Sequence, residues 1–367
     1  MEICNLCTRL HKLAKRTTIH DIAKELNLTS ASVSRELNDH PRISAETKRL
    51  VQAKAEQLKY QRNKIASSLR SGKSHTIGVI IPSAQMNFFG SVVHGIENMA
   101  ISNGYSIILY QSEESSLLEK KAIETFLSAR VDGILASIAK ETIDFAHYED
   151  LKKRNIPLVF FDRTNDTLNI PSVVIDDYKG GFLATEHLIK KGYKRIAHVS
   201  GPQHLKGFRE RFRGYTDALK HYKMKVNKQF IYAGDISIEA GKAATEYFFN
   251  LMEVPDAVFA VEDFTALGVI KGLKERKIKI PAAFGVIGFA NESFDEYITP
   301  ALSSVDQQTV QMGKEAFSLL INMIKIKEGK LDVVLNEQIV LEPVLCFRES
   351  SAGKINVLKD VLVETNS

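Results

Sequence analysis

From residue 76 onward, short apolar segments alternate with stretches in which apolar residues recur at helical spacing. Strands are expected at residues 77–82, 105–110, 133–137, 158–161 and 173–175, and again at 195–199, 230–232, 257–260 and 285–289. A chain that alternates strands with helices forms a parallel sheet with helices on its faces, so this pattern favours an α/β fold. The two series of strands predict two doubly wound parallel-sheet lobes.

The first 75 residues differ from the rest of the chain in charge. They contain 15 Lys and Arg residues against 7 Asp and Glu residues, whereas the remainder contains 34 against 37. A basic head on a slightly acidic body indicates that the head alone meets a polyanion such as DNA. Because basic surfaces are often only solvated, the charge by itself leaves both interpretations open.

Three short helices are expected within this basic head. Thr18 is the expected N-cap of the first, with Asp21 three residues later, and the second begins near Ser30 after a short break. A third helix is expected to open at Ser44 and to pack Val51 behind the first two. Two short helices joined in this way are typical of a helix-turn-helix unit, whose second helix enters the DNA major groove.

A set of residues in and after the head gives a more specific signal. These residues are Thr18, Ala23, Val33, Ser34, Arg35, Leu37, Asn38, Tyr60, Asn63, Ala66, Leu69, Arg70, Ile77 and Gly78. With them the chain resembles the LacI/GalR (lactose-repressor/galactose-repressor) family, and the resemblance extends over residues 17–350. It implies a three-helix helix-turn-helix head with a hinge, followed by a core of two lobes like that of periplasmic binding proteins.

The resemblance also implies a division of the chain. Residues 1–16 form a basic leader that is expected to be disordered, 17–62 the DNA-binding domain, 63–75 the hinge helix and linker, 76–350 an effector-binding and dimerisation core, and 351–367 a tail. Within the core, residues 76–176 and 305–335 are expected in the first lobe, and 177–304 and 337–349 in the second.

The expected DNA contacts follow from the same resemblance. They are Thr18, Thr29, Ser30, Ala31, Ser32, Ser34, Arg35, Asn38, Asn63, Ala66, Leu69 and Arg70. The second helix is expected to face base edges, and Leu69 to act as a wedge in the minor groove once the hinge forms on DNA. Helix capping is the alternative role for Ser30 and Ser32, and packing within the linker for Leu69. Arg62 stands where the family usually has proline, so a phosphate contact is an alternative to a rigid entry into the hinge.

A ligand in a doubly wound fold binds at the carboxyl ends of the strands. The candidate effector-binding residues there are Phe88, Phe89, Asp162, Asp263 and Asn291, and the resemblance adds Arg211, which matches an arginine that reaches the effector in the family. Core packing is the alternative for the two phenylalanines, and an ion pair between lobes for Asp162 with Arg163. The resemblance implies a sugar or sugar derivative as effector. Glu262 and Ala290 replace a common Asn and a common Asp of the family, and the missing carboxylate argues against a simple monosaccharide.

Other classes of protein find little support in the sequence. Phosphate-binding loops, HExxH motifs and nucleophile elbows are absent, so neither an enzyme nor a catalytic residue nor a cofactor is expected. No apolar run reaches the roughly 18 residues of a membrane span, and the N-terminus lacks the apolar part of a secretory signal, so a cytoplasmic location is expected. Cys4 and Cys7 form a lone CxxC with His11 nearby, and because a closed zinc site needs four ligands no metal site is expected.

The expected function is that of a ligand-responsive repressor of carbohydrate-related genes. Two heads of a homodimer are expected to bind the half-sites of a pseudo-palindromic operator, while an effector between the lobes controls the hinge. Two alternatives stay open. A protein corepressor could replace the small effector by docking on the outer face of a lobe. A solute-binding protein for transport is the other, although the basic head and the missing signal argue against it.

Overall fold

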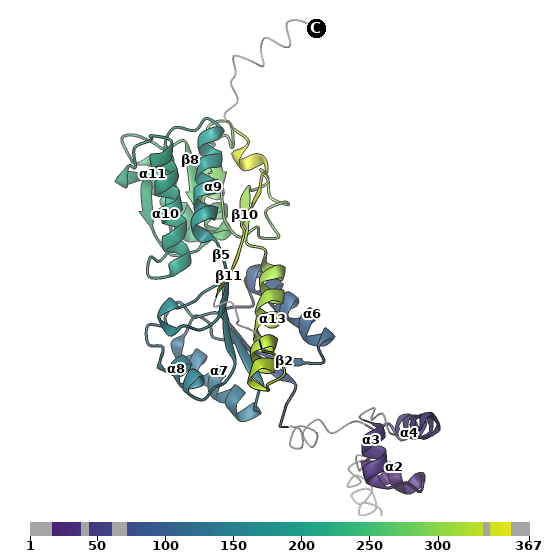
Figure 1. Ribbon diagram of the computed structural model, residues 1–367. Coiled ribbons are helices and arrows are strands. Elements are labelled where there is room, and N and C mark those ends of the chain that lie inside the picture. Colours follow the sequence, from purple (N-terminus) through teal and green to yellow (C-terminus); the bar gives the residue numbers. More distant parts are fainter. Residues whose placement is uncertain (1–16, 38–43, 61–71, 333–337, 354–367) are drawn as a thin grey trace, which may run out of the picture. The chain divides into compact units, whose positions relative to one another are not determined.

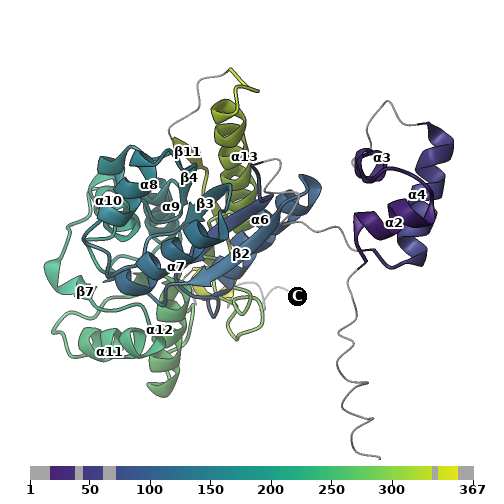
Figure 2. The same ribbon diagram turned by 90° about the horizontal axis from the view of Figure 1, so that it is seen from below.

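The computed structural model describes residues 17–37, 44–60, 72–332 and 338–353. The chain divides into two compact units, residues 1–74 and residues 75–367, and each is described by itself. Figures 1 and 2 show the elements of both units from two directions. Within the described ranges, no helix combines the length and the apolar character that a membrane span requires.

The first unit contains the three expected helices. They are α2 (Ile19–Glu25), α3 (Ser30–Glu36) and α4 (Ala45–Gln57). Thr18 caps α2 in a capping box with Asp21, and Ser44 caps α4, as predicted. The buried core of this unit consists of Ile22, Ala23, Val33 and Val51. Because so small a core contributes little burial, caps worth about 1 kcal/mol each matter to its stability.

A six-stranded sheet forms the centre of the first lobe of the second unit. Its strands are β1 (Thr76–Ile81), β2 (Ser106–Gln111), β3 (Gly133–Ala136), β4 (Leu158–Phe161), β5 (Ser172–Ile175) and β11 (Gln338–Leu341). Their order across the sheet is β11-β5-β4-β3-β1-β2, and every neighbouring pair is parallel. The first five strands lie where the apolar segments predict them.

Helices cover both faces of this sheet. On one face lie α6 (Asn87–Ser102) and α13 (Thr309–Lys327), and on the other α7 (Ser116–Ala129) and α8 (Ala146–Lys153). Helices α6 and α13 meet at Gly95 and Gly313, where a Cβ atom on either glycine would collide with the backbone of the other helix. These two helices therefore form one closely packed pair, which Figure 1 shows side by side.

The second lobe repeats this architecture on a smaller scale. Its parallel sheet has the order β7-β6-β8-β9. The strands are β6 (Ile196–Ser200), β7 (Ile231–Ala233), β8 (Ala257–Ala260) and β9 (Gly285–Ile287). The helices are α9 (Asp177–Lys190) and α10 (Lys206–His221) on one face, and α11 (Ile238–Phe249) and α12 (Asp263–Glu275) on the other. The prediction of two doubly wound lobes is thus confirmed.

Three further strands lie outside the predicted set, and one of them corrects the expected lobe boundaries. β10 (Ser304–Asp306) pairs antiparallel with β12 (Val344–Cys346), whereas β11 pairs with β5 in the first lobe. Residues 337–349 are therefore not all in the second lobe, because the chain returns to that lobe only after Leu341. β11 is a short edge strand in which Val340 is 51% exposed, so its sequence carries little of the signal of a buried strand. Short 3₁₀ turns complete the description: η1 (Asp166–Leu168), η2 (Lys228–Phe230) and η3 (Glu349–Ser351).

Candidate functional site

Helix α3 begins with a group of hydroxyl side chains that already have partners. Thr29, its N-cap, accepts a hydrogen bond at Oγ1 from the Ser32 backbone N–H (3.1 Å), and the two hydroxyl oxygens lie 2.9 Å apart. The Ser30 hydroxyl lies 2.8 Å from Nδ1 of His20 on α2. Ser30 and Ser32 remain partly exposed. Thr29, rather than Ser30 or Ser32, is therefore the cap of α3, and both serines still reach the surface of the head.

The exposed face of α3 is formed by small and basic side chains. Ala31 and Arg35 are exposed and lie four residues apart, so they project from the same face of the helix. Ser34 is partly exposed, and Thr18 at the start of α2 is exposed. The small side chain of Ala31 permits a close approach to a duplex, and the guanidinium of Arg35 has the reach and geometry to contact guanine or phosphate.

Several sequence-based predictions fall outside the described residues. Among the expected DNA contacts these are Asn38, Asn63, Ala66, Leu69 and Arg70. Arg62, Cys4, Cys7 and His11 lie outside as well. The hinge helix, its wedge and the basic leader therefore stay predictions.

A cavity of about 740 Å³ lies between the two lobes of the second unit. The first lobe contributes Asp162, directly after β4, and Phe145, while the second contributes Phe208 and Arg211 from α10. Two of the six candidate effector-binding residues, Asp162 and Arg211, thus line the same space although they lie in different lobes. The cavity offers charged groups of both signs beside aromatic rings.

Asp162 is a carboxylate of this cavity with one hydrogen-bond donor and one neighbouring guanidinium. Ser137 donates a hydrogen bond from Oγ to Asp162 Oδ2 (3.2 Å), and Arg163 Nε lies 3.8 Å from the same oxygen. Burial raises the pKa of Asp162 to about 6, against the opposing effect of Arg163. Near that pH the group changes from a pure acceptor to a hydroxyl donor.

Arg211 is held in a single orientation by three hydrogen bonds. Its Nε donates to Asp177 Oδ1 (2.7 Å), Nη1 to the Val261 carbonyl (2.8 Å) and Nη2 to Gln307 Oε1 (3.1 Å). The guanidinium also lies over the Phe289 ring, 3.7 Å from its centroid. Because these bonds use one N–H of each nitrogen, the second N–H of either terminal nitrogen can serve a ligand.

One wall of the cavity depends on Glu119, which no sequence pattern indicates. Residues 138–145 form this wall without helix or strand. Glu119 on α7 is fully buried and accepts hydrogen bonds from the Ala139 backbone N–H (2.8 Å) and Thr142 Oγ1 (2.6 Å), while His147 Nε2 lies 3.1 Å away. Its partners are at least 20 residues away in the sequence, so only the fold brings them together.

The two lobes also touch beside the cavity. Asp166 of the first lobe pairs with Lys206 Nζ of α10 (2.6 Å), and His204 Nε2 lies 3.0 Å from the Lys140 carbonyl oxygen. Lys140 Nζ lies 3.6 Å from Asp235 of the second lobe. These contacts are exposed, and exposed ion pairs are worth about 0–1 kcal/mol, so they allow the lobes to separate at little cost.

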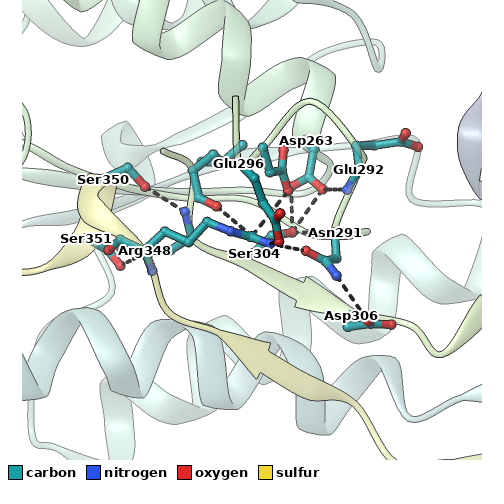
Figure 3. Close-up of polar contacts among 12 residues, drawn as sticks. Asp263, Asn291, Glu292, Glu296, Ser304, Asp306, Arg348, Ser350 and Ser351 are labelled. Atoms are coloured by element: carbon teal, nitrogen blue, oxygen red, sulfur yellow. Dashed lines mark hydrogen bonds and ion pairs between the residues drawn. The ribbon is translucent and has the colours of Figure 1, made fainter. Parts of the chain in front are cut away.

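Asp263 and Asn291 belong to a second group of polar side chains, which does not line the cavity. We call this group the crossover network; it consists of Asp263, Asn291, Glu292, Ser304, Asp306 and Arg348. Ser304 Oγ donates to Asp263 (2.7 Å), Asn291 Nδ2 donates to Asp306 Oδ2 (3.0 Å), and Arg348 Nη2 donates to Asn291 Oδ1 (2.7 Å), as Figure 3 shows. Asp263 and Asn291 are thus fastened to the segments that cross between the lobes.

Burial raises the pKa of further carboxyl groups near the crossover network. The pKa of Glu262 rises to about 8 because it is buried and lies beside Asp263. Glu262 Oε2 accepts a hydrogen bond from the Thr265 backbone N–H (3.2 Å) at the start of α12, while Oε1 has no partner among the described residues. Burial therefore favours the protonated form of Glu262, which stands where the family that the sequence resembles commonly has Asn.

Phe88 and Phe89 pack in the core of the first lobe. They are 6% and 1% exposed, respectively, and their rings meet edge to face with centroids 5.0 Å apart. Neither residue lines the cavity described above. The core-packing alternative for these residues therefore matches their surroundings in this structure.

Comparison with known proteins agrees with this architecture. Residues 18–63 match the family of bacterial regulatory proteins, lacI family, and residues 74–340 match the family of periplasmic binding proteins and sugar binding domain of LacI family. Catabolite control protein A of Priestia megaterium is 35% identical over 304 residues, which cover 83% of this chain and 91% of that protein.

Solved structures resemble this chain over most of its length. The CelR–cellobiose complex of a transcriptional regulator superposes with a TM-score of 0.68 at 26% identity, over 91% of this chain and 100% of that one. The Lac repressor dimer bound to operator and the anti-inducer ONPF superposes with a TM-score of 0.81 at 24% identity, over 92% and 99% of the two chains, and supports the fold alone. The chain belongs to the LacI family of bacterial regulatory proteins and is a DNA-binding transcriptional repressor with a ligand-binding core.

Proposed function

We propose that this repressor is controlled by a sugar or sugar derivative that binds in the cavity between the lobes. The observation that carries the proposal is the cavity itself, about 740 Å³ of space with Asp162 on one side and Arg211 on the other. Small-molecule sites usually span roughly 300–1,000 Å³. Because both lobes line this space, a bound ligand changes the free energy of their relative arrangement.

The chemistry of the lining favours a polyhydroxylated ligand. Asp162 and Asp177 offer acceptors, Arg211 offers donors, and the rings of Phe145 and Phe208 offer apolar surfaces. A sugar ring presents hydroxyl groups at its edge and C–H groups on its faces, so it can use both kinds of partner. The match to a sugar-binding family and the likeness to a cellobiose-bound regulator support the same class.

On the DNA side, the proposal assigns the reading of bases to the exposed face of α3. Ala31 and Arg35 occupy this face, with Ser30, Ser32 and Ser34 beside them and the start of α2 directed to phosphates. Because one such head reads one half-site, a homodimer on a pseudo-palindromic operator is the arrangement that two-fold symmetry favours. The hinge residues complete the predicted contacts.

The proposal is tested by a thermal-shift screen of the full-length protein with mono- and disaccharides and their phosphates. At least one of them should raise the melting temperature and change the affinity for an operator selected from random duplexes. Asp162→Asn should weaken that sugar about tenfold or more, because it replaces an acceptor of charge-assisted hydrogen bonds. Glu253→Gln, an exposed change in the second lobe, should leave sugar affinity unchanged.

The outcomes of this screen separate the alternatives. A shift produced only by ligands without hydroxyl groups would contradict the sugar assignment. A lack of response to every small molecule would contradict the cavity as the control site and favour a protein corepressor.

The DNA side has its own test. Arg35→Ala should lose about 1–3 kcal/mol of binding free energy at one base position of the selected operator, and it should relax the base preference at that position. Binding competitions with operators altered at single positions measure this loss. An equal loss on all sequences would contradict base reading and make Arg35 a phosphate contact.

A further inference from the structure

One hydrogen bond of the crossover network crosses from one lobe to the other. The Phe88 backbone N–H, in the first turn of α6, donates to Glu292 Oε1 (3.3 Å). Phe88 belongs to the first lobe, and Glu292 follows β9 of the second lobe. The N-cap of α6, Met86, makes no side-chain cap hydrogen bond, so a side chain from the other lobe satisfies an N–H that the helix leaves open.

Glu292 is well placed to interact with this helix end. Its side chain is 3% exposed, and its carboxylate points away from Asp263, as Figure 3 shows. A carboxylate at a helix N-terminus interacts favourably with the helix dipole, and more strongly where water is excluded. Burial raises the pKa of Glu292, and the hydrogen bond from Phe88 opposes this rise.

The backbone of Glu292 is linked by hydrogen bonds to the start of β10. Its N–H donates to Asp263 Oδ2 (3.0 Å), and Asp263 also accepts the Ser304 hydroxyl at the start of β10. The preceding residue, Asn291, donates its backbone N–H to Ser304 Oγ (3.0 Å). A change in the path of β10 therefore moves Glu292 with it.

On the first-lobe side of the Glu292–Phe88 contact, helix α6 is closely packed. Helix α6 packs against α13 through Gly95 and Gly313, and α13 begins at Thr309, directly beyond β10. The α6–α13 pair is thus connected to the second lobe twice, through the β10 strand and through Glu292. A rotation of the lobes that moves the start of α6 away from Glu292 breaks the hydrogen bond, while the chain through β10 stays intact.

We propose that Glu292 is a positioning residue that couples the lobes, because it holds the first turn of α6 only while the lobes keep the present arrangement. The regulatory part of this inference rests on the proposed function. A ligand that changes the lobe angle breaks or makes the Glu292–Phe88 contact, and the α6–α13 pair responds as one body.

Hydrogen exchange on the full-length protein, without ligand, tests the contact directly. Glu292→Ala should accelerate exchange of the amides in the first turn of α6 about tenfold. Glu292→Gln keeps an acceptor and should accelerate it less. Glu253→Gln is the matched control and should leave it unchanged. The first turn of α11, which Ser237 of its own lobe caps, reports any general loss of stability.

Two results would overturn the inference at this stage. The first is unchanged exchange at the start of α6 in Glu292→Ala. The second is an equal acceleration at the start of α11, which would mean that the substitution loosens the whole core rather than one contact.

Operator binding tests the coupling. With an operator selected from random duplexes as the probe, Glu292→Ala should change the dissociation constant about fivefold or more, and Glu253→Gln should not. Accelerated exchange with unchanged operator affinity would show that the contact exists but does not couple the lobes. If no sugar affects operator binding by the wild-type protein, the proposed function fails, while the exchange experiment still decides the role of Glu292.

Discussion

The cavity and the crossover network both contain acidic and basic side chains that are buried or half-buried, yet they differ in what surrounds those side chains. In the network, Asp263 and Asn291 each bind protein groups on β10 or beyond β12. In the cavity, Asp162 and Arg211 line open space, although Arg211 also makes three hydrogen bonds to protein groups. The difference suggests a division of roles, in which the cavity binds a ligand and the network transmits the resulting lobe movement.

The largest effect is expected from breaking the buried ion pair of the cavity. Arg211→Ala leaves the Asp177 carboxylate buried without its partner and should lower the free energy of unfolding by about 3–5 kcal/mol in urea titrations. Arg213→Ala, which breaks an exposed pair with Glu210 on the same helix, should cost about 1 kcal/mol or less. Equal costs for both would contradict the structural role of Arg211.

Measurements of the free energy of unfolding at several pH values should reveal the contribution of Asp162 to stability. Its pKa is about 6 in the folded protein against an ordinary value of 3.8, so the folded state retains a proton that the unfolded state loses. The contribution of Asp162 therefore favours folding as the pH falls from 7 toward 4, and it is lost as the pH rises through 6. Above pH 7, Asp162→Asn should raise the free energy of unfolding by up to about 3 kcal/mol, because it removes the buried charge.

This expectation is checked by unfolding the wild-type protein and Asp162→Asn at intervals from pH 4 to pH 8. The difference between the two free energies should grow with pH and level off above pH 7. A difference that is constant across the series would show that Asp162 titrates normally in the folded protein.

A matched pair of serine substitutions compares the two regions most closely. Ser304→Ala removes a donor to Asp263 and the acceptor of the Asn291 N–H, so it should cost about 1–3 kcal/mol of stability. Ser137→Ala removes one longer hydrogen bond to Asp162 beside open space and should cost less than about 1 kcal/mol. A larger loss of stability in Ser137→Ala than in Ser304→Ala, measured by urea unfolding, would contradict the distinction between a closed network and an open cavity.

The sequence is informative wherever a signal is local. The cap at Thr18, the start of α3 at Ser30 and the strand before Asp162 are each visible in a few consecutive residues, and the structure has all of them. The rule that ligands bind at the carboxyl ends of strands points to Asp162, which lines the cavity. Arg211 lies within α10 and is indicated only by the family resemblance.

The strand-end rule could not show which of these residues line the cavity and which belong to the crossover network. Whether Asp263 faces a ligand or a protein hydroxyl depends on Ser304, which lies 41 residues away. The role of Glu119 likewise depends on a wall that only the folded chain forms. For Glu292, the signal is a missing cap at α6, and this becomes visible only when the helix start and its partner are seen together.

The most direct test of the account is the mutual effect of sugar and operator. Titration calorimetry should give the dissociation constant of an active sugar for the free repressor and for the repressor bound to its selected operator. The account predicts two different values, whose ratio equals the factor by which the sugar changes operator affinity. Equal sugar affinities in the two states would contradict it.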